Sequence, residues 1–208
     1  NKSPAELQHE WRMQALYNIG AIQFGQKHYD PAIDTFGAYV NRYPNGPHWS
    51  NAQSMIVNAR YQVGVDLVAE TRYDQARAKL QQFINNHPLD NRNRAILFLF
   101  GQIDYQRAQD LIEQADGTLT DDAAEAFHAA IDQWRKLVSK YPNTNEASLA
   151  LYRIGWIYEQ HLDELDKALE AYRDLTFGSW RPHAHNRIQQ MTNDQLALRT
   201  EKKFRTDA

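Results

Sequence analysis

Hydrophobic and small residues recur along this chain at fixed distances, in a pattern typical of helices that pack in pairs. A small residue is followed four positions later by an aromatic residue or Leu, and eight positions after that by Pro. Three segments share this arrangement: Ala32–Phe36–Pro44, Ala76–Leu80–Pro88 and Ala130–Trp134–Pro142. A repeated helical unit predicts an array in which each unit packs on its neighbours.

The spacing gives each of these positions an expected structural role. In the first two copies a glycine stands twelve residues before the alanine, at Gly20 and Gly64. We expect the small residues where two antiparallel helices cross closely, with the bulky residue of the second helix filling the space beside them. Each Pro should end the second helix, because it has no N–H and disfavours helix in the residue before it. Two less regular copies lie at Gly101 and Gly155, and the last has no closing proline.

Helix-start signals agree with this arrangement. Ser3-Pro4-Ala5-Glu6 has the spacing of a capping box with Pro at the first helical position, and Asn143-Thr144-Asn145-Glu146 has the same spacing. The pattern predicts an all-α fold with eight helices in four antiparallel pairs between about residue 4 and residue 177.

At these offsets the glycine, alanine, aromatic and proline positions resemble the tetratricopeptide repeat (TPR). The resemblance implies a right-handed α–α superhelix of about four TPR-like helical hairpins, with the first helix of each hairpin lining the concave face. It places groove positions three residues before each glycine, and one and four residues after it. The aromatic residues at these positions, expected to bind a partner, are Tyr17, Phe24, Tyr61, Phe98, Tyr105, Tyr152 and Trp156. The alternative, that these rings pack between helices, stays open.

The C-terminal segment departs from the repeats. Leu196, Leu198, Thr200, Lys202 and Phe204 alternate with other residues, a period typical of a strand. We therefore expect a TPR-like repeat domain over residues 1–177, a short terminal helix or linker over 178–193, and a short extended tail over 194–208. The segment from Gly178 onward resembles the junction in large bacterial alpha-macroglobulin-like proteins, where a helical-repeat region leads into β-sandwich domains. By this resemblance the tail would begin a missing domain.

Composition narrows the possible functions. The net charge is −3, with 23 Lys and Arg against 26 acidic residues, so no basic stripe for nucleic acid is expected. No apolar run approaches the roughly 18 residues that a membrane span needs. The chain has no cysteine, and no phosphate-binding loop or catalytic motif. His183 and His185 lack a third ligand at a supporting spacing, so no metal is expected. Because the motifs named above are missing, we also expect no cofactor and no enzymatic activity.

Two functional interpretations remain, both of a non-enzymatic protein outside the cytoplasm, in the periplasm or envelope. The first is a protein–protein interaction scaffold, the N-terminal repeat domain of a larger envelope protein of the alpha-macroglobulin-like kind. Its partner would be another protein or peptide, or later domains of the same chain. The alternative is a lipoprotein-like factor resembling the outer-membrane β-barrel assembly repeats, because Arg42-Tyr43-Pro44-Asn45 and Lys140-Tyr141-Pro142-Asn143 resemble the helix stops of that family.

Overall fold

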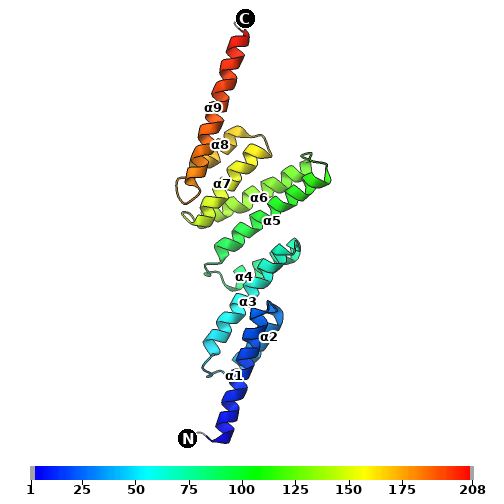
Figure 1. Ribbon diagram of the computed structural model, residues 1–208, viewed down its shortest axis with the longest axis vertical. Coiled ribbons are helices and arrows are strands. Elements are labelled where there is room, and N and C mark those ends of the chain that lie inside the picture. Colours follow the sequence, from blue (N-terminus) through cyan, green and yellow to red (C-terminus); the bar gives the residue numbers. More distant parts are fainter. Residues whose placement is uncertain (1–2, 207–208) are drawn as a thin grey trace. The chain divides into compact units, whose positions relative to one another are not determined.

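The computed structural model of the protein describes residues 3–206, and the side chains of residues 3–194. Within residues 3–206 it contains helices and their connections but no strand, which confirms the all-α prediction (Figure 1). The helices are α1 (Pro4–Gly25), α2 (Tyr29–Arg42), α3 (Trp49–Ala69), α4 (Tyr73–Asn86), α5 (Asn93–Gln114), α6 (Asp121–Lys140), α7 (Asn145–Gln160), α8 (Leu165–Asp174) and α9 (Arg181–Thr206).

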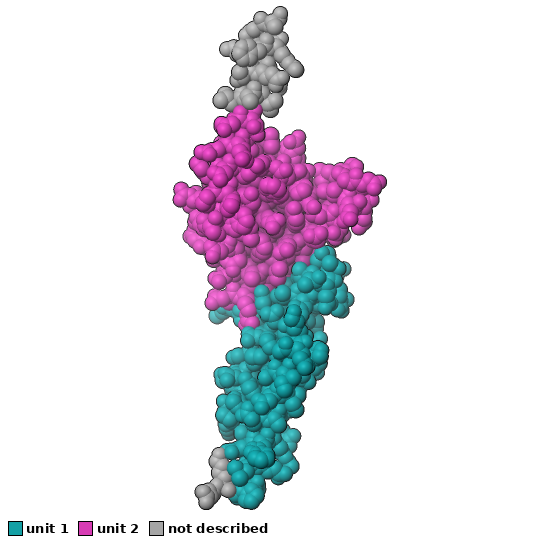
Figure 2. Space-filling model, viewed as in Figure 1, with its two compact units in different colours: residues 1–90 teal, residues 91–208 magenta. Residues whose placement is uncertain are grey.

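The helices pack as consecutive hairpins. α1 packs on α2, α3 on α4, α5 on α6 and α7 on α8, so the expected four pairs are present. The chain forms two compact units, residues 1–90 with α1–α4 and residues 91–208 with α5–α9 (Figure 2). In unit 1, α2 also packs on α3, and in unit 2, α6 also packs on α7. The organisation of residues 1–177 as one repeat domain stays a prediction.

Local signals in the sequence start these helices, with one shift of register. The backbone N–H of Glu6 donates to the Ser3 hydroxyl over 3.3 Å, and the Ser3 N–H donates to the Glu6 carboxylate over 2.7 Å, so the predicted capping box is present. At the start of α7 the capping residue is Thr144 rather than Asn143, and its hydroxyl accepts from the Ala147 N–H over 3.2 Å. Asn143 instead takes a left-handed conformation with φ of 62°.

The two hairpins of unit 1 have tight turns of the same conformation. Lys27 and Thr71, each seven residues after the repeat glycine, adopt left-handed φ values of 62° and 59°. The next residue in each turn donates its N–H back into the preceding helix, from His28 to the Gln23 carbonyl and from Arg72 to the Leu67 carbonyl, both over 2.9 Å. This bonding closes the first helix and reverses the chain into the second.

Each repeat glycine lies against one large residue of the second helix, as the spacing predicted. A Cβ atom at Gly20 would stand 2.8 Å from the Phe36 ring, and one at Gly155 would stand 2.5 Å from the Tyr172 ring. A Cβ atom would likewise collide with Leu80 at Gly64 and with Trp134 at Gly101. The four large side chains are almost fully buried, so the glycines let each hairpin close over its core.

The prediction of an extended tail from residue 194 is wrong, because α9 continues as a helix to Thr206. An isolated strand leaves its backbone N–H and C=O groups unpaired, whereas a helix pairs them within one segment. Leu, Ala, Arg, Glu and Lys are abundant between residues 196 and 203, and all are good helix formers. Residues 207–208 of the expected tail lie outside the described residues.

Candidate partner-binding surface

The seven aromatic residues expected to bind a partner all lie on the first helices of the hairpins. Unit 1 contributes Tyr17 and Phe24 from α1 and Tyr61 from α3; unit 2 contributes Phe98 and Tyr105 from α5 and Tyr152 and Trp156 from α7. All seven are half-buried. Each unit therefore presents its own set of partly exposed rings.

The ring three residues before each glycine packs on an aromatic ring of the second helix in its own hairpin. The centroid distances fall in the range of favourable aromatic contacts. Each of these four rings therefore helps to hold its hairpin together with its buried side, and leaves its other side exposed. The pairs are Tyr17–Phe36 at 5.6 Å, Tyr61–Phe83 at 5.8 Å, Phe98–Trp134 at 5.7 Å and Tyr152–Tyr172 at 5.7 Å.

In unit 1 a histidine that the sequence did not single out joins this surface. The His48 ring stacks on Tyr17 with centroids 4.4 Å apart, and its Nε2 lies 2.8 Å from the Gln14 side-chain oxygen. The His48 backbone N–H also donates to the Tyr39 hydroxyl over 3.2 Å. His48 lies between α2 and α3, outside the helix pattern, so no spacing in the sequence could associate it with Tyr17.

Unit 2 holds a larger aromatic cluster at the start of α9. Trp180 lies 4.9 Å from Tyr152 and 5.0 Å from His183, between ring centroids, and Tyr152 lies 6.4 Å from Trp156. Trp180 was missed because it follows the last repeat. No group of three or more metal-ligating side chains occurs among the described residues, and His183 packs on aromatic rings.

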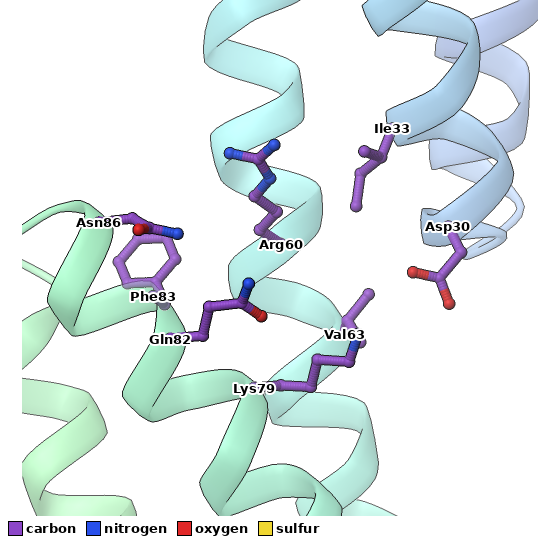
Figure 3. Close-up of a pocket in the computed structure, with 8 residues that line it drawn as sticks. All are labelled: Asp30, Ile33, Arg60, Val63, Lys79, Gln82, Phe83 and Asn86. Carbon is purple, nitrogen blue, oxygen red and sulfur yellow. The ribbon is translucent and has the colours of Figure 1, made fainter.

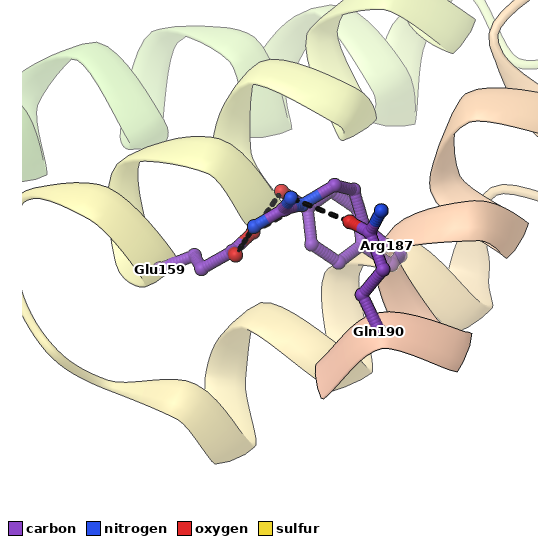
Figure 4. Close-up of polar contacts among 4 residues, drawn as sticks. Glu159, Arg187 and Gln190 are labelled. Atoms are coloured by element: carbon purple, nitrogen blue, oxygen red, sulfur yellow. Dashed lines mark hydrogen bonds and ion pairs between the residues drawn. The ribbon is translucent and has the colours of Figure 1, made fainter. Parts of the chain in front are cut away.

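Beside this cluster, a largely buried ion pair joins α9 to α7. Glu159 of α7 is only 6% exposed in its side chain and forms a two-fold contact with the Arg187 guanidinium, which also donates to the Gln190 side chain over 2.7 Å (Figure 4). The Tyr172 hydroxyl donates to the same carboxylate over 2.9 Å. Burial, and then the nearby Tyr152, raise the pKa of Tyr172, so it keeps the proton that it donates.

The Arg187 guanidinium also lies over the Trp156 ring, 5.8 Å from its centroid. A cation in this position is attracted by the electron-rich face of the indole. One of the seven expected binding residues is therefore covered on one side by α9 itself.

His161 lies beside Tyr105, another of the seven rings, in unit 2. Its ring stacks on Phe127 with centroids 4.4 Å apart, and its Nε2 lies 3.5 Å from the Tyr105 hydroxyl and 3.3 Å from the Gln109 amide. Burial lowers the pKa of His161 below its usual value, so the ring is neutral at neutral pH. The His161 ring therefore adds a polar group beside Tyr105 but no positive charge.

A comparison with protein families supports one of the two functional interpretations better than the other. The profile of the YfiO family, described as outer membrane lipoprotein, matches residues 9–199. The chain belongs to the YfiO family. Its members are non-enzymatic outer-membrane lipoproteins, so the expected location outside the cytoplasm, in the cell envelope, is confirmed, and the protein is not an enzyme. No helix of the described part is long and apolar enough to span a bilayer.

The relatives that this chain matches individually share little sequence identity with it. The chain is 22% identical over 151 residues to the outer membrane protein assembly factor BamD of Neisseria gonorrhoeae, and equally to that of Neisseria meningitidis serogroup A. The aligned region covers 72% of this chain and 54% of each relative. The chain thus spans about half the length of these relatives.

The main interpretation made from the sequence, an alpha-macroglobulin-like parent protein, is not supported. The YfiO match extends to residue 199, into the segment from Gly178 that resembles such a junction. From Arg181 to Thr206 this segment forms the helix α9 and no strand. The alternative interpretation, based on the Tyr-Pro-Asn helix stops, is the better supported one.

Proposed function

We propose that this protein is an assembly factor for outer-membrane proteins that works as a protein-binding scaffold. The observation that carries the proposal is the YfiO match over residues 9–199, together with distant relatives named as assembly factors. Helices packed as consecutive hairpins suit a protein that acts by holding others. Repeat arrays of this kind present extended binding surfaces.

The binding surface in this proposal is the set of seven half-buried aromatic rings. Aromatic side chains contribute large contact areas at low cost in conformational entropy, and they dominate the energies of many protein interfaces. None of the seven side chains carries a formal charge, although Arg153 and Arg187 lie over the rings of Tyr105 and Trp156. The proposal therefore expects binding that varies little with salt concentration.

The proposal is tested by replacing the gene in its own host with a depletable copy and measuring folded outer-membrane β-barrel proteins by their heat-modifiable migration on gels. Depletion should lower the folded fraction. A Tyr61→Leu/Tyr152→Leu variant, which keeps apolar volume but removes two rings, should restore it only in part at equal abundance. The control is Tyr141→Leu, which removes a half-buried ring outside the seven.

The proposed function fails if depletion leaves β-barrel folding unchanged. If depletion lowers folding but the double variant restores it fully, the protein remains an assembly factor and the seven rings are not its binding surface. Circular dichroism of each purified variant separates loss of binding from loss of folding.

A further inference from the structure

A hollow in unit 1 places two cations over an apolar floor. It lies among α2, α3 and α4 and has a volume of about 240 Å³. Figure 3 shows Arg60 on α3 and Lys79 on α4 beside it, and Asp30 on α2 at the opposite wall. Ile33, Val63 and the buried ring of Phe83 supply the apolar surface. Charged and apolar groups are thus available to one ligand.

The two cations have no acidic partner within the part of the chain that the structure describes. Among the residues that the structure describes, neither Arg60 nor Lys79 forms an ion pair, and both side chains are exposed. Asp30 lines the same hollow without pairing with either of them. Their charges therefore remain available to an anion from outside.

The repeat pattern shows that Arg60 is out of place as a packing residue. The position four residues before the repeat glycine is Leu in the other three copies, at Leu16, Leu97 and Leu151. Only the second copy has a charged residue there. A cation at a position that otherwise carries Leu costs apolar packing, which a role in binding explains.

The same comparison applies to Lys79. The position three residues after the repeat alanine carries Thr35, Gln133 and Ala171 in the other copies. An equivalent hollow of about 220 Å³ occurs in unit 2, where Leu151 and Ala171 stand at the repeat positions of the two cations. Its charged residues come from other repeat positions and balance one another; they are Arg135, Lys167, Glu170 and Asp174. The hollow is thus a recurrent feature of the fold, and cations at these two repeat positions are specific to unit 1.

The geometry points to a site for an acidic, partly apolar segment of a protein partner, with a carboxylate side chain between Arg60 and Lys79 and an apolar side chain on Val63 and Phe83. A volume of about 240 Å³ is below the range of roughly 300–1,000 Å³ typical of pockets that enclose a whole small-molecule ligand. It suits one or two side chains of a longer segment.

The remaining polar groups favour a peptide over a phosphate group. The side-chain amides of Gln82 and Asn86, four residues apart on α4, can donate to and accept from a peptide backbone. The carboxylate of Asp30 can accept a backbone N–H, but it would repel a doubly charged phosphate more than a singly charged carboxylate. A salt-sensitive contact is expected, because the two cations are exposed.

This site differs from the surface in the proposed function. On α3 the hollow is lined by Arg60 and Val63, three residues apart and on one face, whereas Tyr61 lies about 100° further round the helix. The Tyr61 ring packs on Phe83, a lining residue of the hollow, so the two surfaces are tested separately with Tyr152, which lies in unit 2.

The test uses an acetylated, amidated peptide of alternating Leu and Glu, and the same peptide with Gln in place of Glu, titrated into the isotope-labelled full chain by NMR. The Glu peptide should shift amide signals of α3 and α4 around the hollow, and the Gln peptide should not. Arg60→Leu, which places here the residue of the other repeats, should weaken binding at least about ten-fold, as expected for loss of a charge-assisted contact.

Lys79→Thr should weaken binding several-fold, and Arg135→Leu, the same kind of change in the hollow of unit 2, should leave it unchanged. Tyr152→Leu, in unit 2, should also leave it unchanged. Equal binding by the Gln peptide or by the Arg60→Leu variant would overturn the inference. So would displacement of the peptide by inorganic phosphate at equal affinity, or Arg60-dependent retention of the chain on phosphatidylglycerol vesicles in the absence of peptide binding.

Discussion

At the scale of single residues, four glycines set how closely the two helices of each hairpin approach. Three of the large residues opposite them, Phe36, Leu80 and Trp134, followed from the spacing in the sequence, because a repeated offset exposes the same contact several times. Close contacts that occur once could not be predicted in this way. Gly46 lies under the Tyr39 hydroxyl, where a Cβ atom would stand only 2.6 Å away, and no second copy marks the position.

The glycine contacts lead to a prediction of opposite signs in one hairpin. Gly20→Ala should destabilise the protein by roughly 1–3 kcal/mol, because the added methyl group would press on the fully buried Phe36 ring. Gly37→Ala on α2 should stabilise it by about 0.5–1 kcal/mol, because no atom lies within 4 Å of the added Cβ and alanine is the better helix former. Urea unfolding of the two variants measures both values, and a change of the same sign in both would contradict the close-crossing interpretation.

How far each aromatic ring is exposed could not be predicted from the sequence either, because exposure also depends on contacts that occur only once. The period along a helix identifies which residues share a face, but a ring on that face can be covered by a segment far along the chain. Trp156 illustrates this, because Arg187 of α9 lies over it. The sequence left packing and binding open as alternatives for these rings, and the structure adds that their buried part packs on the second helices.

At the scale of elements, the eight repeat helices were predictable because periodic small residues, capping residues and proline stops agree with one another. The ninth was not. An alternating pattern of only a few residues fits a strand and an exposed helix equally, and the absence of a neighbouring strand decides for the helix. What holds the first part of α9 is also not periodic, since the Glu159–Arg187 pair joins residues 28 positions apart.

The Glu159–Arg187 ion pair should contribute strongly to the docking of α9. Arg187→Met should destabilise the docking of α9 by roughly 3–5 kcal/mol, because it leaves the Glu159 carboxylate buried and without its cation, while the Tyr172 hydroxyl still donates to it. Adding Glu159→Gln should recover most of the loss, since the neutral amide still accepts from Tyr172. Hydrogen exchange across residues 181–194 measures the effect.

The control for the ion pair is Arg94→Met, which breaks the more exposed Arg94–Glu146 pair, where the side chains are 42% and 28% exposed. An exposed pair of this kind should contribute less than about 1 kcal/mol. Equal effects of Arg94→Met and Arg187→Met, or failure of the added Glu159→Gln to restore protection, would show that α9 is held by its apolar contacts alone.

At the scale of the whole molecule, the two compact units each contain a buried core of their own. Unit 1 buries Phe36 and Tyr39, and unit 2 buries Trp134, Ile154 and Tyr172. The YfiO match covers parts of both units, so the family feature is the series of hairpins and not one unit. In repeat proteins, stability is approximately a sum of the units and of the contacts between neighbours.

We therefore expect the chain to be divisible between residues 90 and 91. Both pieces, produced separately, should be helical by circular dichroism, because each keeps its hairpins complete. The piece of residues 91–208 should melt at the higher temperature, since a longer chain buries a larger share of its surface. A cut after Thr71 is the matched control: it separates α3 from α4 and opens the contact of Gly64 with Leu80, so the first piece should lose helix content. If both cuts give equally folded pieces, the hairpin is not the folding unit; if the pieces divided after residue 90 are both unfolded, the two cores depend on each other.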